Sequence, residues 1–208
     1  MEGSVSWDVP VSTRVSFVSA LSVWSPRCDP TIRAGDLIIG TGRSAIGTVV
    51  ERKSRSTLLV HLPRLEGWGE NPYVKNGPAL GGYGAVAMNA ALVATMTKLP
   101  EQLRKTLTWD RGKELSAHAQ FALETGTKVF FADPHSPWQR PTNENTNGLL
   151  RQYFPKGTDL SRWSAEDLEA VALALNNRPR ISLNWRTPAE VFEEQLRSLQ
   201  QHGVATTD

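Results

Sequence analysis

The sequence predicts an α/β domain built on a mixed sheet, and two observations lead to this fold class. Three short runs rich in β-branched residues come first, and helical and strand-like segments then alternate along the chain. Consecutive short strands favour an antiparallel meander, whereas strands separated by helices are expected to lie parallel. The expected sheet therefore has five strands, antiparallel at first and parallel later, flanked by helices, with further helices at the C-terminal end.

The first three strands are predicted from Gly35 onward, in the runs GDLIIGT, GTVVERKS and STLLVHLP. Turns containing Gly and Ser separate them. The Gly- and Pro-rich stretch from Pro63 to Gly84 is typical of a long loop. The run AVAMNAALVATMTKLP then predicts a helix that ends before Pro100.

The second half of the chain alternates more regularly. LTWDRG predicts a strand, KELSAHAQFALETG a helix that stops at Gly126, and TKVFFADP a strand apolar enough for a central, buried position. A further helix is expected to begin near Glu144. Two more helices have clear start signals, a capping box formed by Ser164 and Asp167 and the cap sequence TPAE at 187–190.

These patterns divide the chain into three parts. Residues 1–31 are rich in Ser and Val, carry few charges and show no sustained period, so we expect a poorly ordered N-terminal segment. Residues 32–160 form the predicted α/β core. Residues 161–208 are predicted to be a C-terminal helical extension.

Composition excludes several classes of protein. No apolar run approaches the roughly 18 to 20 residues of a membrane span, and no secretory signal is visible, so we expect a cytoplasmic protein without a membrane partner. Cys28 is the only cysteine, which excludes an internal disulfide and a cysteine-based metal cluster. The net charge is only +2, so a binding site for a polyanion has to be a local patch.

Three acidic residues fall at the ends of predicted elements. Asp36 lies in the first strand, Asp110 ends the fourth, and Glu144 begins the helix after the fifth. If the first and fourth strands are neighbours, as a right-handed crossover allows, these carboxylates converge. Their repulsion would be relieved by divalent cations, and magnesium suits an all-oxygen site. The alternative is that each acid only forms a turn or complements a helix dipole.

The helix after Glu144 has two different faces. At 100° per residue, Glu144, Asn147 and Arg151 share one face, and Leu150 lies on the opposite, apolar one. The polar face is either a solvated surface or part of a binding site. Trp109 and Trp138 flank the same region, and we expect core packing for each, with stacking on a DNA base as the alternative.

Four stretches together resemble a known family: GDLIIG, LTWDRGKE, DPHSPWQRPTNENTNGLLRQYFPKGTDL and LNNRPRISLNWRTPAEVF. They are similar to the catalytic domain of the transposase family named after insertion sequence 30. These DDE transposases have a ribonuclease-H-like fold of the retroviral-integrase type. The resemblance runs from about Gly35 to the C-terminus. It places the family's catalytic, metal-binding acids at Asp36, Asp110 and Glu144, with 33 residues between the last two.

The resemblance implies metal-dependent DNA strand cleavage followed by strand transfer of a mobile element. It implies Mg²⁺ or Mn²⁺, as two ions, and DNA partners, namely transposon ends and target DNA. A homo-oligomer is also expected. The family's basic residue two helical turns after the glutamate falls on Arg151. Arg140, Asn147 and Lys156 are further candidates for DNA contacts.

Departures from the family pattern leave two other functions open. Arg33 and Ala34 stand where the family has Trp-Glu, and Pro141 stands where it has Gly. Residues 1–31 do not resemble the family's N-terminal helix-turn-helix region, so we expect the chain to lack that region, as a truncated or frame-shifted gene copy would. The chain could then be an impaired fragment that only binds DNA or oligomerises. A ribonuclease-H-like nuclease that only hydrolyses is the third hypothesis.

Overall fold

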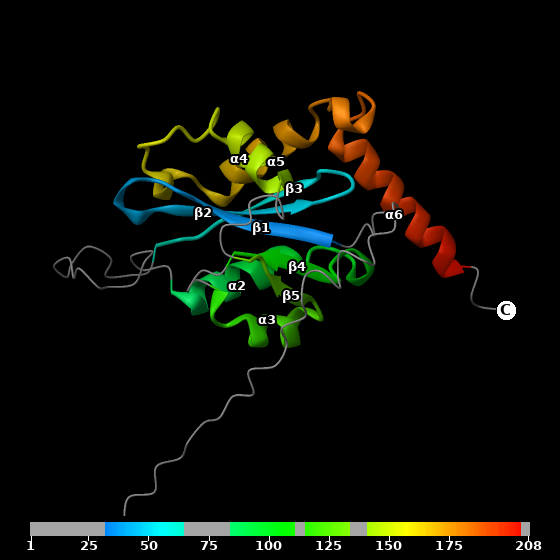
Figure 1. The fold of residues 1–208 in the computed structure, drawn as a ribbon, viewed down its shortest axis with the longest axis horizontal. Coiled ribbons are helices and arrows are strands. Elements are labelled where there is room, and N and C mark those ends of the chain that lie inside the picture. Colours follow the sequence, from blue (N-terminus) through cyan, green and yellow to red (C-terminus); the bar gives the residue numbers. More distant parts are fainter. Residues whose placement is uncertain (1–31, 65–83, 111–114, 134–140, 205–208) are drawn as a thin grey trace, which may run out of the picture.

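The computed structural model describes residues 32–64, 84–110, 115–133 and 141–204. The sheet runs through the middle of the molecule, with helices on both of its faces (Figure 1). The predictions for residues 1–31 and for most of the long loop after Pro63 lie outside the described residues.

The described strands form one five-stranded sheet in the order β3-β2-β1-β4-β5. The strands are β1 (Ile32–Ile39), β2 (Ala45–Glu51), β3 (Thr57–Val60), β4 (Thr106–Trp109) and β5 (Lys128–Phe131). The first three strands pair antiparallel, β4 pairs parallel with β1, and β5 pairs parallel with β4. The predicted mixed sheet is confirmed.

One expectation for the sheet was wrong. The apolar run that forms β5 was expected at a central, buried position, but β5 is an edge strand, and Phe130 on its outer side is 37% exposed. The apolar composition of β5 is explained by its other side, where Val129 and Phe131 pack against a hydrophobic core. A short apolar run does not distinguish a central strand from an edge strand with one covered face.

The described residues form five α-helices around the sheet. They are α2 (Ala85–Met96), α3 (His118–Thr125), α4 (Pro141–Leu150), α5 (Ala165–Asn176) and α6 (Pro188–Val204). Short 3₁₀ turns occupy Thr41–Arg43, Glu101–Leu103, Leu160–Arg162 and Ile181–Leu183. Helices α2 and α3 lie on one face, α4 and α5 on the other, and α6 extends from the edge (Figure 1). None of the helices described combines the length and the apolar character that crossing a bilayer requires.

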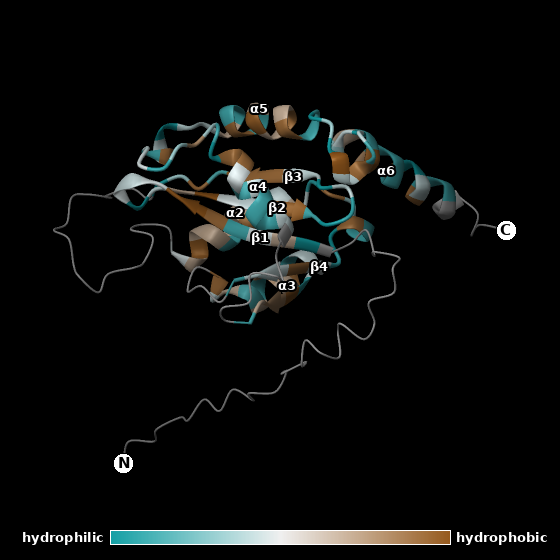
Figure 2. Ribbon diagram, turned by 45° about the horizontal axis from the view of Figure 1, so that its top comes forward, coloured by the Kyte–Doolittle hydropathy of each residue, from teal (hydrophilic) through white to brown (hydrophobic). Residues whose placement is uncertain are grey.

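The predicted start signals of α5 and α6 are both present. Ser164 and Asp167 form a reciprocal capping box at the start of α5. At the start of α6, the Thr187 hydroxyl accepts from the amide of Glu190, whose carboxylate accepts from the amide of Thr187. These bonds satisfy amide groups that a helix start otherwise leaves unpaired. Polar and apolar residues alternate along α5, which packs its apolar side on the sheet (Figure 2).

The two faces of the sheet bury two separate cores. The core under α2 and α3 contains Val49, Val60, Met88, Leu92, Leu107, Trp109 and Phe121. The core under α4 and α5 contains Ile38, Ile46, Leu150, Phe154, Leu168 and Leu175. Because successive side chains of a strand point to opposite faces, β2 supplies both cores and is buried over its whole length.

Trp109 packs directly on the backbone of Gly35. The indole is completely buried, which confirms the expected core role of Trp109. A Cβ atom on Gly35 would lie 2.0 Å from Cε3 and Cζ3 of this ring. Only glycine therefore allows the indole to lie against β1 at this position.

A buried charged pair lies at the start of β1, and α6 covers it. Arg33 is directly opposite Glu51 of β2, and both are completely buried. The Arg33 guanidinium donates to the carbonyl of Leu103 and lies 5.8 Å from the ring centroid of Phe192 in α6. Burial lowers the pKa of Arg33 to about 10, and the charge of Glu51 opposes this shift. Gln195 of α6 donates to Glu51. Arg33 thus has a structural role.

Ala34 and Pro141, the other two departures from the family pattern, each fit their local surroundings. Ala34 is 1% exposed between its partners on β2 and β4, so a glutamate there would bury its carboxylate. Pro141 is the first residue of α4. That position needs no amide hydrogen, and the fixed φ of proline suits it. Pro141 is therefore compatible with the helix that carries Glu144.

We predict that Gly35→Ala lowers the free energy of unfolding by at least about 1–3 kcal/mol, because the added methyl group overlaps the Trp109 ring. The matched control is Gly148→Ala in α4, where an added Cβ has no described atom within 4 Å. That control should gain up to about 1 kcal/mol from better helix propensity. Urea unfolding of both variants tests this, and equal stabilities would contradict it.

Candidate active site

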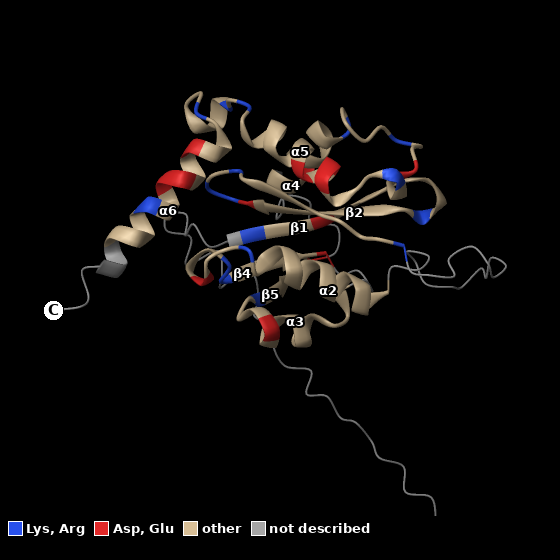
Figure 3. Cartoon of the chain, turned by 180° about the vertical axis from the view of Figure 1, so that it is seen from behind, with Lys and Arg blue, Asp and Glu red and all other residues tan. Residues whose placement is uncertain are grey.

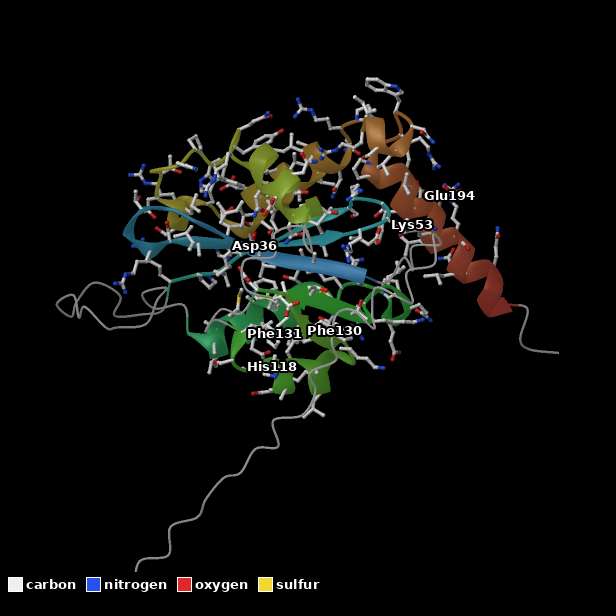
Figure 4. The ribbon with its side chains drawn as sticks, viewed as in Figure 1. Asp36, Lys53, His118, Phe130, Phe131 and Glu194 are labelled. Atoms are coloured by element: carbon white, nitrogen blue, oxygen red, sulfur yellow. The ribbon has the colours of Figure 1, made fainter. Side chains whose placement is uncertain are left out.

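Asp36 in β1 and Asp110, the residue directly after β4, follow the last residue pair of two neighbouring parallel strands by the same number of residues. The pairing of β1 with β4 runs from Ile32–Thr106 to Ala34–Thr108. Asp36 comes two residues after Ala34, and Asp110 comes two residues after Thr108. Both acids are half-buried. Figure 4 shows Asp36 on β1 in the middle of the molecule. The expected neighbourhood of the first and fourth strands is confirmed.

The carboxylate of Asp36 is held by two elements. Its Oδ1 accepts from the backbone amide of Leu37 at 2.8 Å, and its Oδ2 accepts from Nδ2 of Asn147 in α4 at 2.9 Å. Thr48 of β2, which faces Asp36 in the sheet register, lies beside both groups. Its hydroxyl is 3.2 Å from the carbonyl oxygen of Asp36 and 3.4 Å from Oδ1 of Asn147.

Glu144 lies one helical turn before Asn147 on α4, and it is exposed. The contact between Asn147 and Asp36 therefore brings the start of α4 toward β1. Among the residues that the structure describes, no three Asp, Glu, His or Cys side chains lie close enough together to hold a metal ion. The structure thus places Asp36 and Asp110 on adjacent strands and Glu144 on the adjoining helix, without gathering the three carboxylates into one cluster.

The two faces of α4 are as expected. Leu150 is completely buried, and Leu149 and Tyr153 pack against the same core. The polar side carries the exposed Glu144, and the half-buried Arg151 guanidinium lies 3.4 Å from the carbonyl of Phe154.

Of the remaining expected residues, the structure describes only Lys156. Lys156 follows α4 and is exposed. Arg140 and Trp138 lie outside the described residues. Thr48 was missed because a buried threonine in an apolar strand gives no signal until the register with β1 is known.

A surface pocket of about 670 Å³ lies away from these acids, beyond the C-terminal end of α4. Its lining residues are Tyr153, Pro155, Gly157, Thr158, Asp159, Arg162, Trp163 and Asp167. None of the three expected acids lines it, so we assign it no part in the candidate site.

Comparison with known proteins finds transposases of insertion sequences among the relatives of this chain. A transposase of insertion sequence element IS30A from Escherichia coli is 48% identical over 174 residues, which cover 84% of this chain. A transposase of IS1086 from Cupriavidus metallidurans is 48% identical over 163 residues, or 78% of this chain. Over most of its length the chain is thus similar to transposases of the IS30 family. A more distant relative, the transposase of IS4351 from Bacteroides fragilis, is 34% identical over 175 residues. No profile of a known protein family matches the chain.

The chain spans 39% of the length of the Escherichia coli IS30 transposase and 43% of the Cupriavidus one. Among solved structures, it resembles the catalytic core domain of BIV integrase, with a TM-score of 0.55 and 14% identity. That match covers 82% of this chain and 99% of the integrase chain. It confirms the expected ribonuclease-H-like fold of the integrase type.

We predict that Asn147→Ala lowers the free energy of unfolding by about 1.5 kcal/mol, because the bond to the charged Asp36 is lost. The figure lies at the low end of the range for such bonds since Asp36 is only half-buried. Asn145→Ala, on the exposed side of the same helix, is the control and should change stability by less than about 0.5 kcal/mol. If the two variants unfold at the same urea concentration, the Asn147 contact contributes nothing.

Proposed function

We propose that this chain is the catalytic domain of a DDE transposase, which cleaves DNA strands and joins them to target DNA in metal-dependent reactions. One observation carries the proposal. Asp36 and Asp110 lie at matching positions of parallel β1 and β4, and α4, which bears Glu144, is held against Asp36 through Asn147. The relationship to IS30 transposases supports it.

In this proposal Asp36, Asp110 and Glu144 hold Mg²⁺ or Mn²⁺, as two ions. Three carboxylates from separate elements make an all-oxygen donor set, which these cations prefer. Glu144 is exposed, so its side chain can turn toward the strands without disturbing the core. When bound, the ions supply Lewis acidity at the scissile phosphate and offset the charge that develops there.

The protein's own contribution is to position the acids and the DNA. Asn147 and Thr48 orient the Asp36 carboxylate, so we assign Asn147 to this positioning role in place of the DNA contact expected from sequence. Arg151, Lys156 and Arg140 are proposed to contact DNA phosphates. Such contacts set the register of the DNA and bind all sequences alike. Transposon ends, target DNA and a second copy of the chain are the proposed partners.

An impaired fragment that only binds DNA or oligomerises is the second candidate. The separation of the three carboxylates and the buried Ala34 favour it. Metal-dependent nicking of duplex DNA distinguishes the transposase from this fragment. Joining of a DNA 3′-end to a second duplex distinguishes it from a ribonuclease-H-like nuclease that only hydrolyses.

We predict that Asp110→Asn abolishes strand cleavage and weakens Mn²⁺ binding while the thermal unfolding curve stays unchanged. One ligand charge is removed with little change in volume. Nicking assays and calorimetric Mn²⁺ titrations check this, with Glu124→Gln on the exposed side of α3 as the control. Cleavage by Asp110→Asn at the parental rate would remove Asp110 from the mechanism.

We predict that Arg151→Ala weakens DNA binding equally for all sequences. The slope of log affinity against log salt should fall by about one, the value for one lost phosphate contact. Fluorescence anisotropy over a salt series measures this, and Lys98→Ala, an exposed charge after α2, is the control. An unchanged slope, or a loss confined to one base sequence, would argue against a phosphate contact.

A further inference from the structure

The turn between α5 and α6 holds a tryptophan out into solvent. Trp185 is 71% exposed and Ile181 is 74% exposed. Asn184 and Trp185 have φ values of 55° and 64°, in the left-handed region that residues other than glycine rarely adopt. Backbone strain of this kind costs stability and persists only where the surroundings enforce it.

A dense set of backbone hydrogen bonds enforces this conformation. The amide of Trp185 donates to the carbonyl of Arg180 at 2.9 Å, and the amide of Arg180 donates to the carbonyl of Arg186 at 3.0 Å. The amide of Asn184 donates to the carbonyl of Ile181 in the same turn. The backbone that carries the exposed indole is therefore fixed.

Arginines surround the base of this turn. Arg178 is exposed, Arg180 is half-buried, and Arg55 reaches the same place from the hairpin between β2 and β3. Burial lowers the pKa of Arg180, and repulsion from Arg178 and Arg55 lowers it further. Within the described part of the chain, the buried Nε of Arg180 has no hydrogen-bond partner. An anion bound here would relieve the repulsion among the three guanidinium groups.

The same arginines border the helix of the candidate active site. The Arg55 guanidinium donates to the hydroxyl of Thr142, two residues before Glu144. The Arg178 guanidinium donates to Oε1 of Gln152 at 3.1 Å, at the C-terminal end of α4. Figure 3 shows basic residues on the β2–β3 hairpin and on the turn between α5 and α6. Lys53 of that hairpin and Glu194 of α6 lie on one side of the molecule (Figure 4).

We propose that Arg55, Arg178, Arg180 and Trp185 form a second DNA-contact surface, which holds an unpaired strand beside the candidate active site. Guanidinium groups bind phosphates in a fixed fork geometry. An indole stacks on a nucleobase only where the base is free of its own helical stack, as in an unpaired strand. The surface therefore fits a junction between duplex and single strand. This inference rests on the proposed function, since it takes DNA as the substrate.

The test compares two labelled DNA probes, a blunt duplex and a forked duplex with the same base pairs and one unpaired arm. The 208-residue chain is measured by fluorescence anisotropy beside Arg178→Ala/Arg180→Ala, Trp185→Ala and Trp185→Phe. The control is Arg197→Ala, an exposed arginine on α6 that pairs with Glu193 away from the turn. Thermal unfolding confirms that each variant is folded.

Arg178→Ala/Arg180→Ala should bind both probes more weakly than the Arg197→Ala control does. Its slope of log affinity against log salt should be smaller by about two. Trp185→Ala should lose about 5- to 150-fold affinity for the forked probe alone, the range of one base stack. Trp185→Phe should retain most of that affinity.

Three results would overturn the proposal. Equal effects of the turn variants and of Arg197→Ala on DNA binding would remove the surface while leaving the proposed function intact. A loss of self-association in sedimentation, with DNA binding unchanged, would make the turn a contact between protein chains. If the parental chain binds neither probe, both this inference and the proposed function fail.

Discussion

The contact between the backbone of Gly35 and the indole of Trp109 sets the geometry of the candidate site. The residue after each of them is an acid, Asp36 on β1 and Asp110 at the end of β4. Because Gly35 has no Cβ, the buried Trp109 ring lies directly against β1. A change in the register of β1 and β4 would move Asp36 away from Asp110. One packing contact thereby aligns two carboxylates from distant parts of the sequence.

The third acid depends on a second, independent anchor. Leu150 fixes the C-terminal end of α4 in the core, and Asn147 connects the middle of the helix to Asp36. Glu144 lies at the free end of this arrangement, where its side chain is exposed. In the proposed function, the two strand acids stay fixed and the helix acid turns toward them when cations bind. Arg151 follows directly after the same helix, and Thr142 within the helix contacts Arg55, so the proposed DNA contacts lie around the helix that carries Glu144.

The net charge is only +2, so a strongly charged region of this protein has to be local, and the described residues contain two clusters of charged side chains. At one end of the sheet, Arg33 and Glu51 are buried together under α6, an arrangement that costs desolvation and leaves no charge for a partner. Around the turn between α5 and α6, arginines repel one another and Trp185 stays in solvent. The first cluster brings two opposite charges together, although Nη1 and Nη2 of Arg33 have no hydrogen-bond partner among the described residues. The second cluster gathers like charges, which is the basis of the proposed DNA contact.

The sequence by itself determined the elements, the mixed sheet and the capping boxes, because propensity and periodicity are local properties. The assignment of the three acids came from the resemblance to a family, and it stays a prediction. The sequence did not determine the edge position of β5, the bond between Asn147 and Asp36, or the pairing of Arg33 with Glu51. It also gave no sign that Arg55 and Arg178 both lie near enough to Arg180 to repel it. These features join segments far apart in the chain. They are decided by strand register and by how helices pack across the sheet, which no local pattern encodes.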